Sequence, residues 1–345
     1  MKRLFVLACL IMFYVSSFSQ DEVKVMQYNL LYYGTNTGWC NANNNNVEEK
    51  NAYIRTILEE VRPDIMTVCE FGADESLVES FLSSNLNING VDTWKSTPII
   101  NMASSNIINC IFYDSDKLTM RRHSVAQTFI RDIDVYEMYF NTDELAQGDT
   151  IELVCVVGHL KAGGGNEDKF KRKVMIQSTM NYLEKYYKEK NVLIMGDFNF
   201  YNSEEPAYKL MTNNITYPNS YFIDPLGPSA VGDWNNNYQY KDYHTQSTSS
   251  ENEGCASDGG LDSRFDFILM SESISTGRDG VRYVADSYEA FGNDGNHFNE
   301  SINASSNSAV SQEVADALCY SSDHLPVILK LQIDAEVGNH KNINH

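Results

Sequence analysis

The sequence predicts an α/β protein built on a layered β-sheet core. Short, nearly continuous apolar runs recur along the chain, at residues 65 to 69, 153 to 157, 192 to 195 and 325 to 331. Such runs are typical of strands covered on both faces, because a sheet open to water on one side alternates apolar with polar residues. Two amphipathic helices lie between the runs, so a sheet core covered by helices is expected.

Each of the two helices has an apolar face. The first is expected over residues 47 to 61, and its buried face would hold Ile54, Ile57, Leu58 and Val61. Pro63 ends it, because proline disfavours helical backbone in the residue before it. The second is expected over residues 167 to 189, with a stripe made of Ile176, Met180, Leu183 and Tyr187. Both helices should pack on the outer faces of the sheet core.

The N-terminus has the pattern of a secretory signal peptide. Lys2 and Arg3 precede an apolar stretch from Leu4 to Val15, and small polar residues follow up to Gln20. The stretch is shorter than the ~20 residues that span a bilayer, so no stable membrane insertion is expected. We therefore expect a secreted or periplasmic protein with a cleaved leader at residues 1 to 20, one domain at 21 to 335 and a polar tail at 336 to 345.

The formal net charge of −21 argues against a broad basic surface. Proteins that grip long polyanions by counterion release need such a surface. The charge does not exclude phosphate substrates, because a bound metal ion attracts phosphate locally.

The cysteines divide into two groups. Those inside apolar runs are expected to be buried thiols, namely Cys69, Cys110 and Cys155. Those in loop-like sequence are candidates for disulfides in an exported chain, namely Cys40, Cys255 and Cys319.

A carboxylate at a buried strand end indicates a cation. Glu70 directly follows the apolar run at residues 65 to 69, where an unpaired carboxylate is costly. Mg²⁺ takes one or two carboxylates and leaves room in its shell for water and phosphate, which Glu70 together with Asn29 would permit. An ion pair between Glu70 and a Lys or Arg is the structural alternative.

Asp197 and Asn199 lie in the segment Gly-Asp-Phe-Asn at residues 196 to 199. On an extended segment their side chains point the same way, and Phe198 between them points into the core. Asp197 is the candidate base for an attacking water, and Asn199 is the candidate that holds a phosphate oxygen through its NH₂ group. A turn in which both residues bind nearby backbone is the alternative.

His324 has two acidic candidates for partners. Asp323 precedes it directly, and Asp266 begins another apolar strand. Asp266 is expected to fix the tautomer of His324, which would then stabilise charge on a phosphate. Asp323 would remain available to the metal.

His159 and Arg131 complete the candidate residues. His159 follows the strand at residues 153 to 157 and would stabilise the leaving oxygen, although a structural role is the alternative. Arg131 is a candidate clamp on the phosphate, since guanidinium groups bind phosphate oxygens in pairs. Pairing with its neighbours Asp132 and Asp134 is the alternative for Arg131.

In this order the clusters resemble the endonuclease/exonuclease/phosphatase superfamily, whose fold is deoxyribonuclease I-like, over about residues 23 to 332. Residues 26 to 30 resemble its first strand motif, Cys69-Glu70 its metal-binding Gln-Glu pair, and residues 158 to 160 its histidine block. Its last three blocks are similar to residues 196 to 199, 264 to 267 and 322 to 327. Cys69 departs from the usual Gln.

The resemblance implies a four-layer α/β sandwich, in which two packed mixed β-sheets are flanked by helices and one site lies at an edge of the sheets. It implies dependence on Mg²⁺, or on Mn²⁺ or Ca²⁺, with Glu70 and Asn29 at the metal. Asp197 would activate water, Asn199 would position it, and the pair Asp266 and His324 would bind phosphate.

The expected function is metal-dependent hydrolysis of phosphodiester bonds by a monomer, with DNA or RNA as the first candidate substrate. A phosphodiesterase or phosphatase acting on a lipid head group or a small phosphorylated molecule is the alternative. A non-catalytic binding module is a third interpretation, disfavoured because every catalytic residue type is retained.

Two long polar insertions, at residues 227 to 262 and 286 to 320, are expected to rim the site because motifs flank them. The first holds aromatic residues that either stack on unpaired bases or pack the loop, namely Trp234, Tyr238, Tyr240, Tyr243 and His244, with Lys241 available for a phosphate. In the second, the polar segment at residues 292 to 297 is expected to form a turn rather than a cation site.

Overall fold

The computed structural model describes residues 21–142, 150–251 and 254–334. The expected leader and the expected polar tail lie outside these residues. Within the described part of the chain, no helix combines the length and the apolar character that a membrane span requires.

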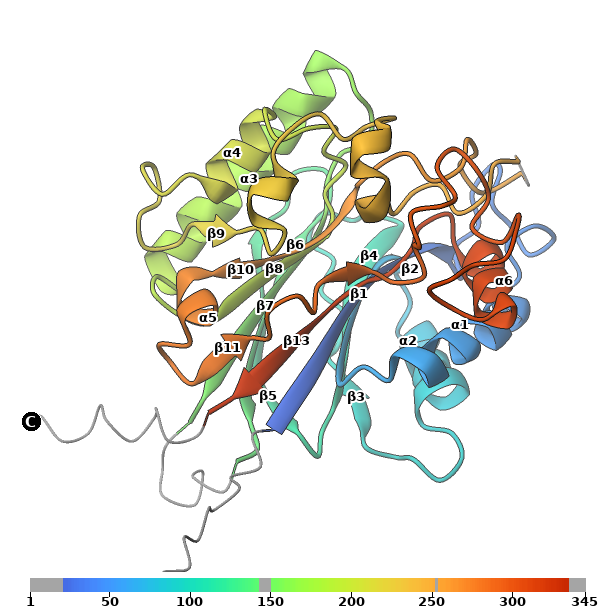
Figure 1. The fold of residues 1–345 in the computed structure, drawn as a ribbon. Helices are drawn as coiled ribbons and strands as arrows, with labels where there is room; N and C mark the ends of the chain where they lie inside the picture. The colour runs from blue at the N-terminus through green and yellow to red at the C-terminus, as the bar shows by residue number, and fades with distance from the viewer. Residues whose placement is uncertain (1–20, 143–149, 252–253, 335–345) are drawn as a thin grey trace, which may run out of the picture.

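Two β-sheets pack face to face in the described residues (Figure 1). One has the order β11 (Val281–Tyr283), β13 (Val327–Ile333), β1 (Asp21–Tyr33), β2 (Ile65–Gly72), β4 (Ile107–Asp114) and β3 (Trp94–Ser96), with β12 (Glu289–Ala290) beside β13. The other has the order β5 (Leu118–Gln127), β6 (Ile133–Phe140), β7 (Glu152–His159), β8 (Val192–Asp197), β10 (Asp266–Ser271) and β9 (Phe222–Ile223). Both sheets are mixed, since β1 runs parallel to β2 and β7 to β8, while their other neighbours are antiparallel.

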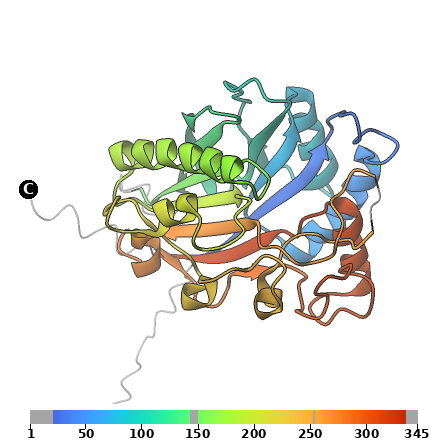
Figure 2. The same ribbon diagram turned by 90° about the horizontal axis from the view of Figure 1, so that it is seen from above.

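Helices cover the outer faces of both sheets, which gives the four layers that were expected (Figure 2). The first sheet is covered by α1 (Val47–Val61), α2 (Glu75–Phe81), a π-helical turn η1 (Leu82–Leu86) and α6 (Gln312–Ser321). The second is covered by α3 (Asn166–Tyr186) and α4 (Pro206–Thr212). The short elements α5 (Glu272–Thr276), η3 (Gly227–Ala230) and η4 (Tyr238–Tyr243) lie in the connections.

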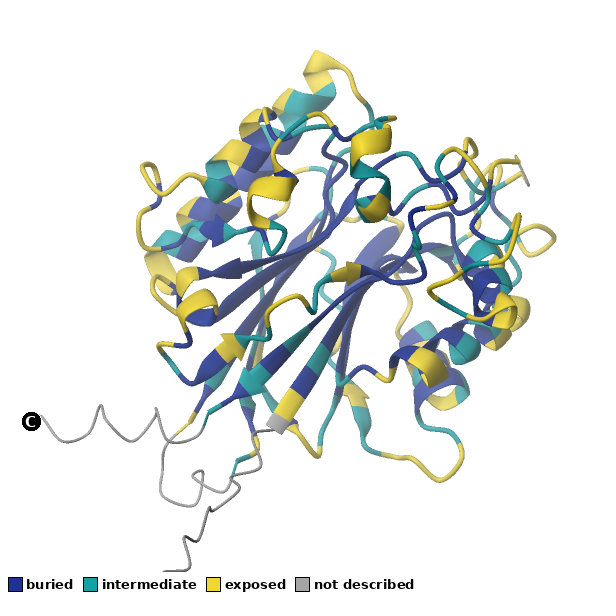
Figure 3. Cartoon of the chain, viewed as in Figure 1, coloured by how far each residue is buried: buried dark blue, intermediate teal, exposed yellow. Residues whose placement is uncertain are grey.

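Each central strand is buried on both faces (Figure 3). On β8, Leu193 and Met195 pack between the two sheets, whereas Val192 and Ile194 pack under the helices of the second sheet. This double burial explains why the strand segments are continuous apolar runs.

The predicted helices are present, with one difference in length. The first runs over the expected residues, and Arg62 ends it in a left-handed conformation, with φ of 50°. The second ends at Tyr186 rather than at residue 189, because Tyr187 leaves the helical conformation. The ring of Tyr187 still packs in the core beside the second sheet, and its hydroxyl donates to Glu137 on β6.

Backbone pairing brings the predicted motifs to one edge of the sheets. His159 at the end of β7 is the register partner of Asp197 on β8, and Asp266 on β10 is also a partner of Asp197. Gly196 permits this approach: a Cβ atom there would lie 1.8 Å from the Gly158 oxygen, and its φ is 148°. A side chain at residue 196 would therefore push β7 and β8 apart at the edge that carries the motifs.

The cysteines follow the predicted division except at Cys319, which was a candidate for a disulfide but lies on α6 as a thiol. Cys40 and Cys255 form a disulfide that ties the loop after β1 to the first insertion. Cys69, Cys110 and Cys155 are buried thiols.

Arg264 belongs to one of the motifs but serves the fold. Its guanidinium is buried and donates to both carboxylate oxygens of Asp224, at 2.9 and 3.0 Å. It also lies over the ring of Phe267, 4.4 Å from the ring centre. The pair therefore anchors the start of β10, and with it the neighbouring Asp266.

We predict that Asp224→Ala lowers the free energy of unfolding by about 3–5 kcal/mol, because it leaves the Arg264 guanidinium buried and unpaired. Urea denaturation followed by circular dichroism measures the change. Glu204→Ala is the matched control, since it removes an ion pair to Lys209 at the surface and should cost less than about 1 kcal/mol. Equal losses in the two variants would contradict the role assigned to Arg264.

Candidate active site

Side chains from both sheets meet in a compact buried cluster. The Nδ2 atom of Asn29 lies 3.2 Å from Oε1 of Glu70 and 3.0 Å from Oδ2 of Asp197. The Nε2 atom of His159 lies 3.7 Å from the same Glu70 oxygen and 3.5 Å from the same Asp197 oxygen. Ligand atoms of Glu70, His159 and Asp197 all lie within 4.8 Å of one another. This spacing allows one ion to contact all three.

The cluster fits a divalent cation. Burial raises the pKa of Glu70, and Asp323 raises it further. Burial also raises the pKa of Asp197 to about 7, although the neighbouring His324 acts in the opposite direction. A bound cation would stabilise the ionised form of both carboxylates. The carboxylate oxygens of Glu70 and Asp197 suit Mg²⁺ or Mn²⁺, which prefer oxygen ligands.

Main-chain amides orient two members of the cluster. The amide of Leu31 donates to Oδ1 of Asn29 at 2.9 Å, and the amide of Tyr32 donates to Oε2 of Glu70 at 3.1 Å. Leu31, Tyr32 and Glu70 all have positive φ, at 45°, 50° and 56°. Residues other than glycine rarely adopt this conformation, and such strained residues concentrate at functional sites.

Asp266 and His324 form the expected pair. Nδ1 of His324 lies 2.7 Å from Oδ2 of Asp266, and Nε2 lies 3.7 Å from Oδ2 of Asp197. Burial alone would lower the pKa of His324, but Asp266 and Asp197 outweigh it and raise the pKa well above its usual value. The two aspartates therefore favour the protonated form of the imidazole.

Asp323 faces a different set of donors. Its Oδ2 atom accepts from Gln246 at 3.2 Å and from the amide of Ser257 at 2.9 Å. It is not one of the three residues at ligand spacing. Asp323 thus lies at the rim of the cluster, where its charge acts on Glu70.

Asn199 lies next to the cluster but bonds to backbone. Its Nδ2 atom lies 3.4 Å from the carbonyl oxygen of Leu160, and its amide donates to Oδ1 of Asp197 at 3.1 Å. The second bond is the local turn contact that was the alternative interpretation of this segment. Phe198 points into the core, as predicted.

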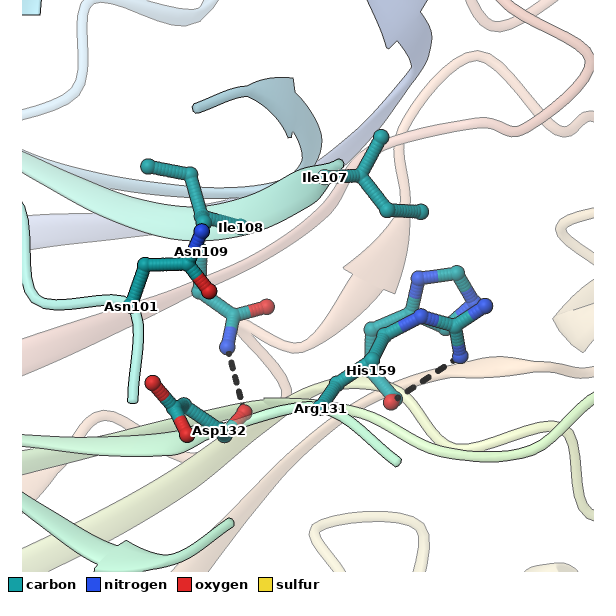
Figure 4. A pocket seen from close by; sticks show the side chains of 7 residues that line it. All are labelled: Asn101, Ile107, Ile108, Asn109, Arg131, Asp132 and His159. Atoms are coloured by element: carbon teal, nitrogen blue, oxygen red, sulfur yellow. Dashed lines mark hydrogen bonds between the residues drawn. The ribbon is translucent and has the colours of Figure 1, made fainter. Parts of the chain in front are cut away.

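Arg131 and His159 line a small pocket beside the cluster (Figure 4). Arg131 donates to the carbonyl oxygens of His159 and Leu160, at 3.4 and 3.2 Å. Its acidic neighbours have other partners, since Asp132 accepts from the amides of residues 102 and 103 and Asp134 pairs with His123. The alternative pairing of Arg131 with Asp132 or Asp134 is therefore wrong.

His159 is held as a neutral imidazole. Burial lowers its pKa well below the usual value, and the positive Arg131 lowers it further. Its Nδ1 atom is buried without a hydrogen-bond partner among the described residues. A neutral ring with Nε2 toward Glu70 and Asp197 is suited to contact a cation.

The aromatic residues of the first insertion mostly pack the loop. Trp234 is fully buried and donates to the carbonyl oxygen of Phe200, and His244 is buried against the carbonyl oxygen of Trp234. Tyr238 is exposed, and Lys241 donates to the carbonyl oxygen of Gly295.

The polar segment of the second insertion forms the expected turn. Asp294 accepts from the amides of Asn296 and Ser308 and from Nδ1 of His297. Its oxygens are therefore occupied by protein donors.

Three residues of the site were not predicted. Thr245 donates to Oδ2 of Asp266 at 2.6 Å, and Gln246 contacts Nε2 of His324 at 2.7 Å. Lys50 on α1 reaches the backbone beside Asn29. The first two are polar residues within a long polar insertion, so no local pattern distinguishes them.

Comparisons with known proteins show which solved structures share this fold. No family model matches the sequence, and no curated protein matches it. An endonuclease/exonuclease/phosphatase structure from Bacteroides vulgatus matches 91% of this chain and 100% of that chain at 14% identity, with a TM-score of 0.56. The chain has the endonuclease/exonuclease/phosphatase fold.

Two further structures match with comparable coverage. D. rerio TDP2 complexed with single strand DNA product matches 90% of this chain and 98% of that chain at 11% identity, with a TM-score of 0.53. The human Nocturnin catalytic domain with bound sulfate anion matches 92% and 98% at 15% identity, with a TM-score of 0.51. The fold implied by the sequence motifs is thus confirmed.

We predict that Mn²⁺ at a hundredfold excess over its Kd raises the Tm of the protein by roughly 5 °C, because ligands that bind only the folded state stabilise it. Glu70→Gln keeps the shape of the side chain but removes its charge, so the shift should largely disappear. Differential scanning calorimetry with metal and with EDTA measures both. An equal shift in the variant would contradict a cation site at Glu70.

Proposed function

We propose that the protein is a divalent-metal-dependent hydrolase of phosphodiester bonds. The observation that carries the proposal is the buried meeting of Asn29, Glu70, His159 and Asp197 from two sheets, beside the charged pair of Asp266 and His324. Carboxylates for a cation and a cationic imidazole for a phosphate lie within one site. Both kinds of group can stabilise the charge that develops during phosphodiester hydrolysis.

The residues of the site have separate roles in cation binding, proton transfer and phosphate binding. Glu70 would hold the cation together with Asp197 and His159, and Asn29 would position the two carboxylates through its NH₂ group. Mg²⁺ is the ion we propose. When bound, the cation would neutralise phosphate charge and stabilise the leaving oxygen.

Asp197 accepts the proton of the attacking water, and Asn199 helps position that water. The imidazolium of His324 donates to a phosphate oxygen, and Asp266 holds its ring in place. Arg131, which lines the pocket beside His159, supplies positive charge to the same phosphate.

Nucleic acid is the first candidate substrate. The fold is shared with D. rerio TDP2, whose structure holds a single strand DNA product. A small phosphodiester or a lipid head group is the second candidate, and the formal net charge of −21 favours it because a long polyanion is repelled by an acidic surface. The two candidates share the bond that is broken.

The site of action is proposed to lie outside the cytoplasm. The leader-like pattern at residues 1 to 20 supports export. The disulfide between Cys40 and Cys255 supports it independently, because disulfides persist in oxidising compartments.

Hydrolysis of plasmid DNA, single-stranded DNA, RNA and bis-p-nitrophenyl phosphate, with Mg²⁺, Mn²⁺ or Ca²⁺ and with EDTA, tests the proposal. Metal-dependent cutting of a polymer would support a nuclease. Cleavage of the small diester alone would support the second candidate. A protein that binds Mn²⁺ through Glu70 but hydrolyses none of these substrates would contradict the proposed activity.

We predict that Asp197→Ala and His324→Ala each lower kcat by at least about a hundredfold, because each removes a group that moves or stabilises charge during hydrolysis. His297→Ala is the matched control, since its imidazole is also buried and bound to an aspartate, 2.9 Å from Asp294, but lies in the turn of the second insertion. A loss of similar size in the control would contradict the assignment of the site.

A further inference from the structure

Lys50 on helix α1 is buried beside the site. The side chain of Lys50 is 3% exposed, and its Nζ atom donates to the carbonyl oxygens of Leu30 and Leu31, at 2.6 and 2.7 Å. Burial lowers the pKa of Lys50 to about 7, although Asp323 and Glu70 act to raise it. Lysine is almost never fully buried without a partner, so this contact needs an explanation beyond packing.

The two carbonyl groups belong to the turn that orients the cluster. The peptide that contains the Leu30 carbonyl also contains the Leu31 amide, which donates to Oδ1 of Asn29. The peptide that contains the Leu31 carbonyl contains the Tyr32 amide, which donates to Oε2 of Glu70. A peptide group is planar, and its C=O and N–H point in opposite directions. Fixing each carbonyl therefore fixes the amide behind it.

Asn45 supports the same turn from the loop before α1. Its Nδ2 atom donates to the carbonyl oxygens of Leu31 and Tyr32, at 2.9 and 3.2 Å. Leu31 and Tyr32 hold left-handed conformations, which cost free energy unless the surroundings impose them. Lys50 and Asn45 thus both donate hydrogen bonds to the carbonyl oxygens of this strained segment.

We propose that Lys50 is a positioning residue for the cation site: by holding two peptide groups at the end of β1, it aims their amides at Asn29 and Glu70. The inference rests on the cation site of the proposed function. Substitution of residues that orient metal ligands through hydrogen bonds typically weakens metal affinity by about ten- to a hundredfold.

Titration of the full protein with Mn²⁺, followed by electron paramagnetic resonance, tests the proposal without any substrate. Lys50→Met is expected to raise the Mn²⁺ Kd by about tenfold or more. Lys50→Arg keeps N–H donors at this position and should retain most of the affinity. Arg55→Met is the control on the same helix, since Arg55 binds the Ser84 carbonyl oxygen at 3.0 Å, away from β1.

Thermal stability and Mn²⁺ affinity should change independently in these variants. Lys50→Met and Arg55→Met are both expected to lower Tm slightly, but only Lys50→Met should weaken Mn²⁺ binding. An unchanged Mn²⁺ Kd in Lys50→Met would overturn the proposal. If that variant fails to fold, Asn45→Ala loosens the same turn, and an unchanged Kd in Asn45→Ala would overturn the proposal equally.

The wild type and Glu70→Gln separate this inference from the proposed function. Mn²⁺ binding that depends on Glu70, without hydrolysis of any phosphodiester, would remove the proposed activity but leave Lys50 to be judged by the Kd values. Absence of Glu70-dependent Mn²⁺ binding in the wild type would overturn both.

Discussion

The carboxamide of Asn29 is the contact on which the site depends, because it joins carboxylates that the two sheets supply separately. Asn29 and Glu70 belong to neighbouring strands of one sheet, and Asp197 belongs to the other. One NH₂ group donates to both carboxylates, which is possible only where the edges of the packed sheets are aligned. Carboxylates held so close raise each other's pKa and favour a positive partner. The close grouping of possible cation ligands thus follows from how the sheets pack.

The fold holds this arrangement with rigid elements rather than with loops alone. The close approach of Gly158 and Gly196 sets the register of His159 and Asp197, and the buried pair of Arg264 and Asp224 anchors the strand that begins at Asp266. The left-handed residues at Leu31, Tyr32 and Glu70 store strain at the same edge. A site of this kind is maintained because the surrounding core is fully packed on both faces of each sheet.

The strands, the first helix and the meeting of the motifs were predictable, because apolar runs and helical stripes report burial directly. Roles that depend on tertiary contacts were not. Trp234 was a candidate for stacking on bases but is buried in the core, and the contact of one Asp323 oxygen with Gln246 was not foreseen. Thr245, Gln246 and Lys50 reach the site only because distant segments fold beside it, and their local sequence carries no sign of this. Local patterns therefore located the clustered side chains better than the residues that orient them.

Diffraction from crystals soaked in Mn²⁺, with data collected at the manganese absorption edge, tests the central claim most directly. The account predicts an anomalous peak within coordination distance of a Glu70 carboxylate oxygen, at the point where Asn29, His159 and Asp197 meet. Absence of a peak at this point under conditions of measured Mn²⁺ binding, or a peak at another acidic group such as Asp294, would contradict the claim that the two sheets together build a cation site.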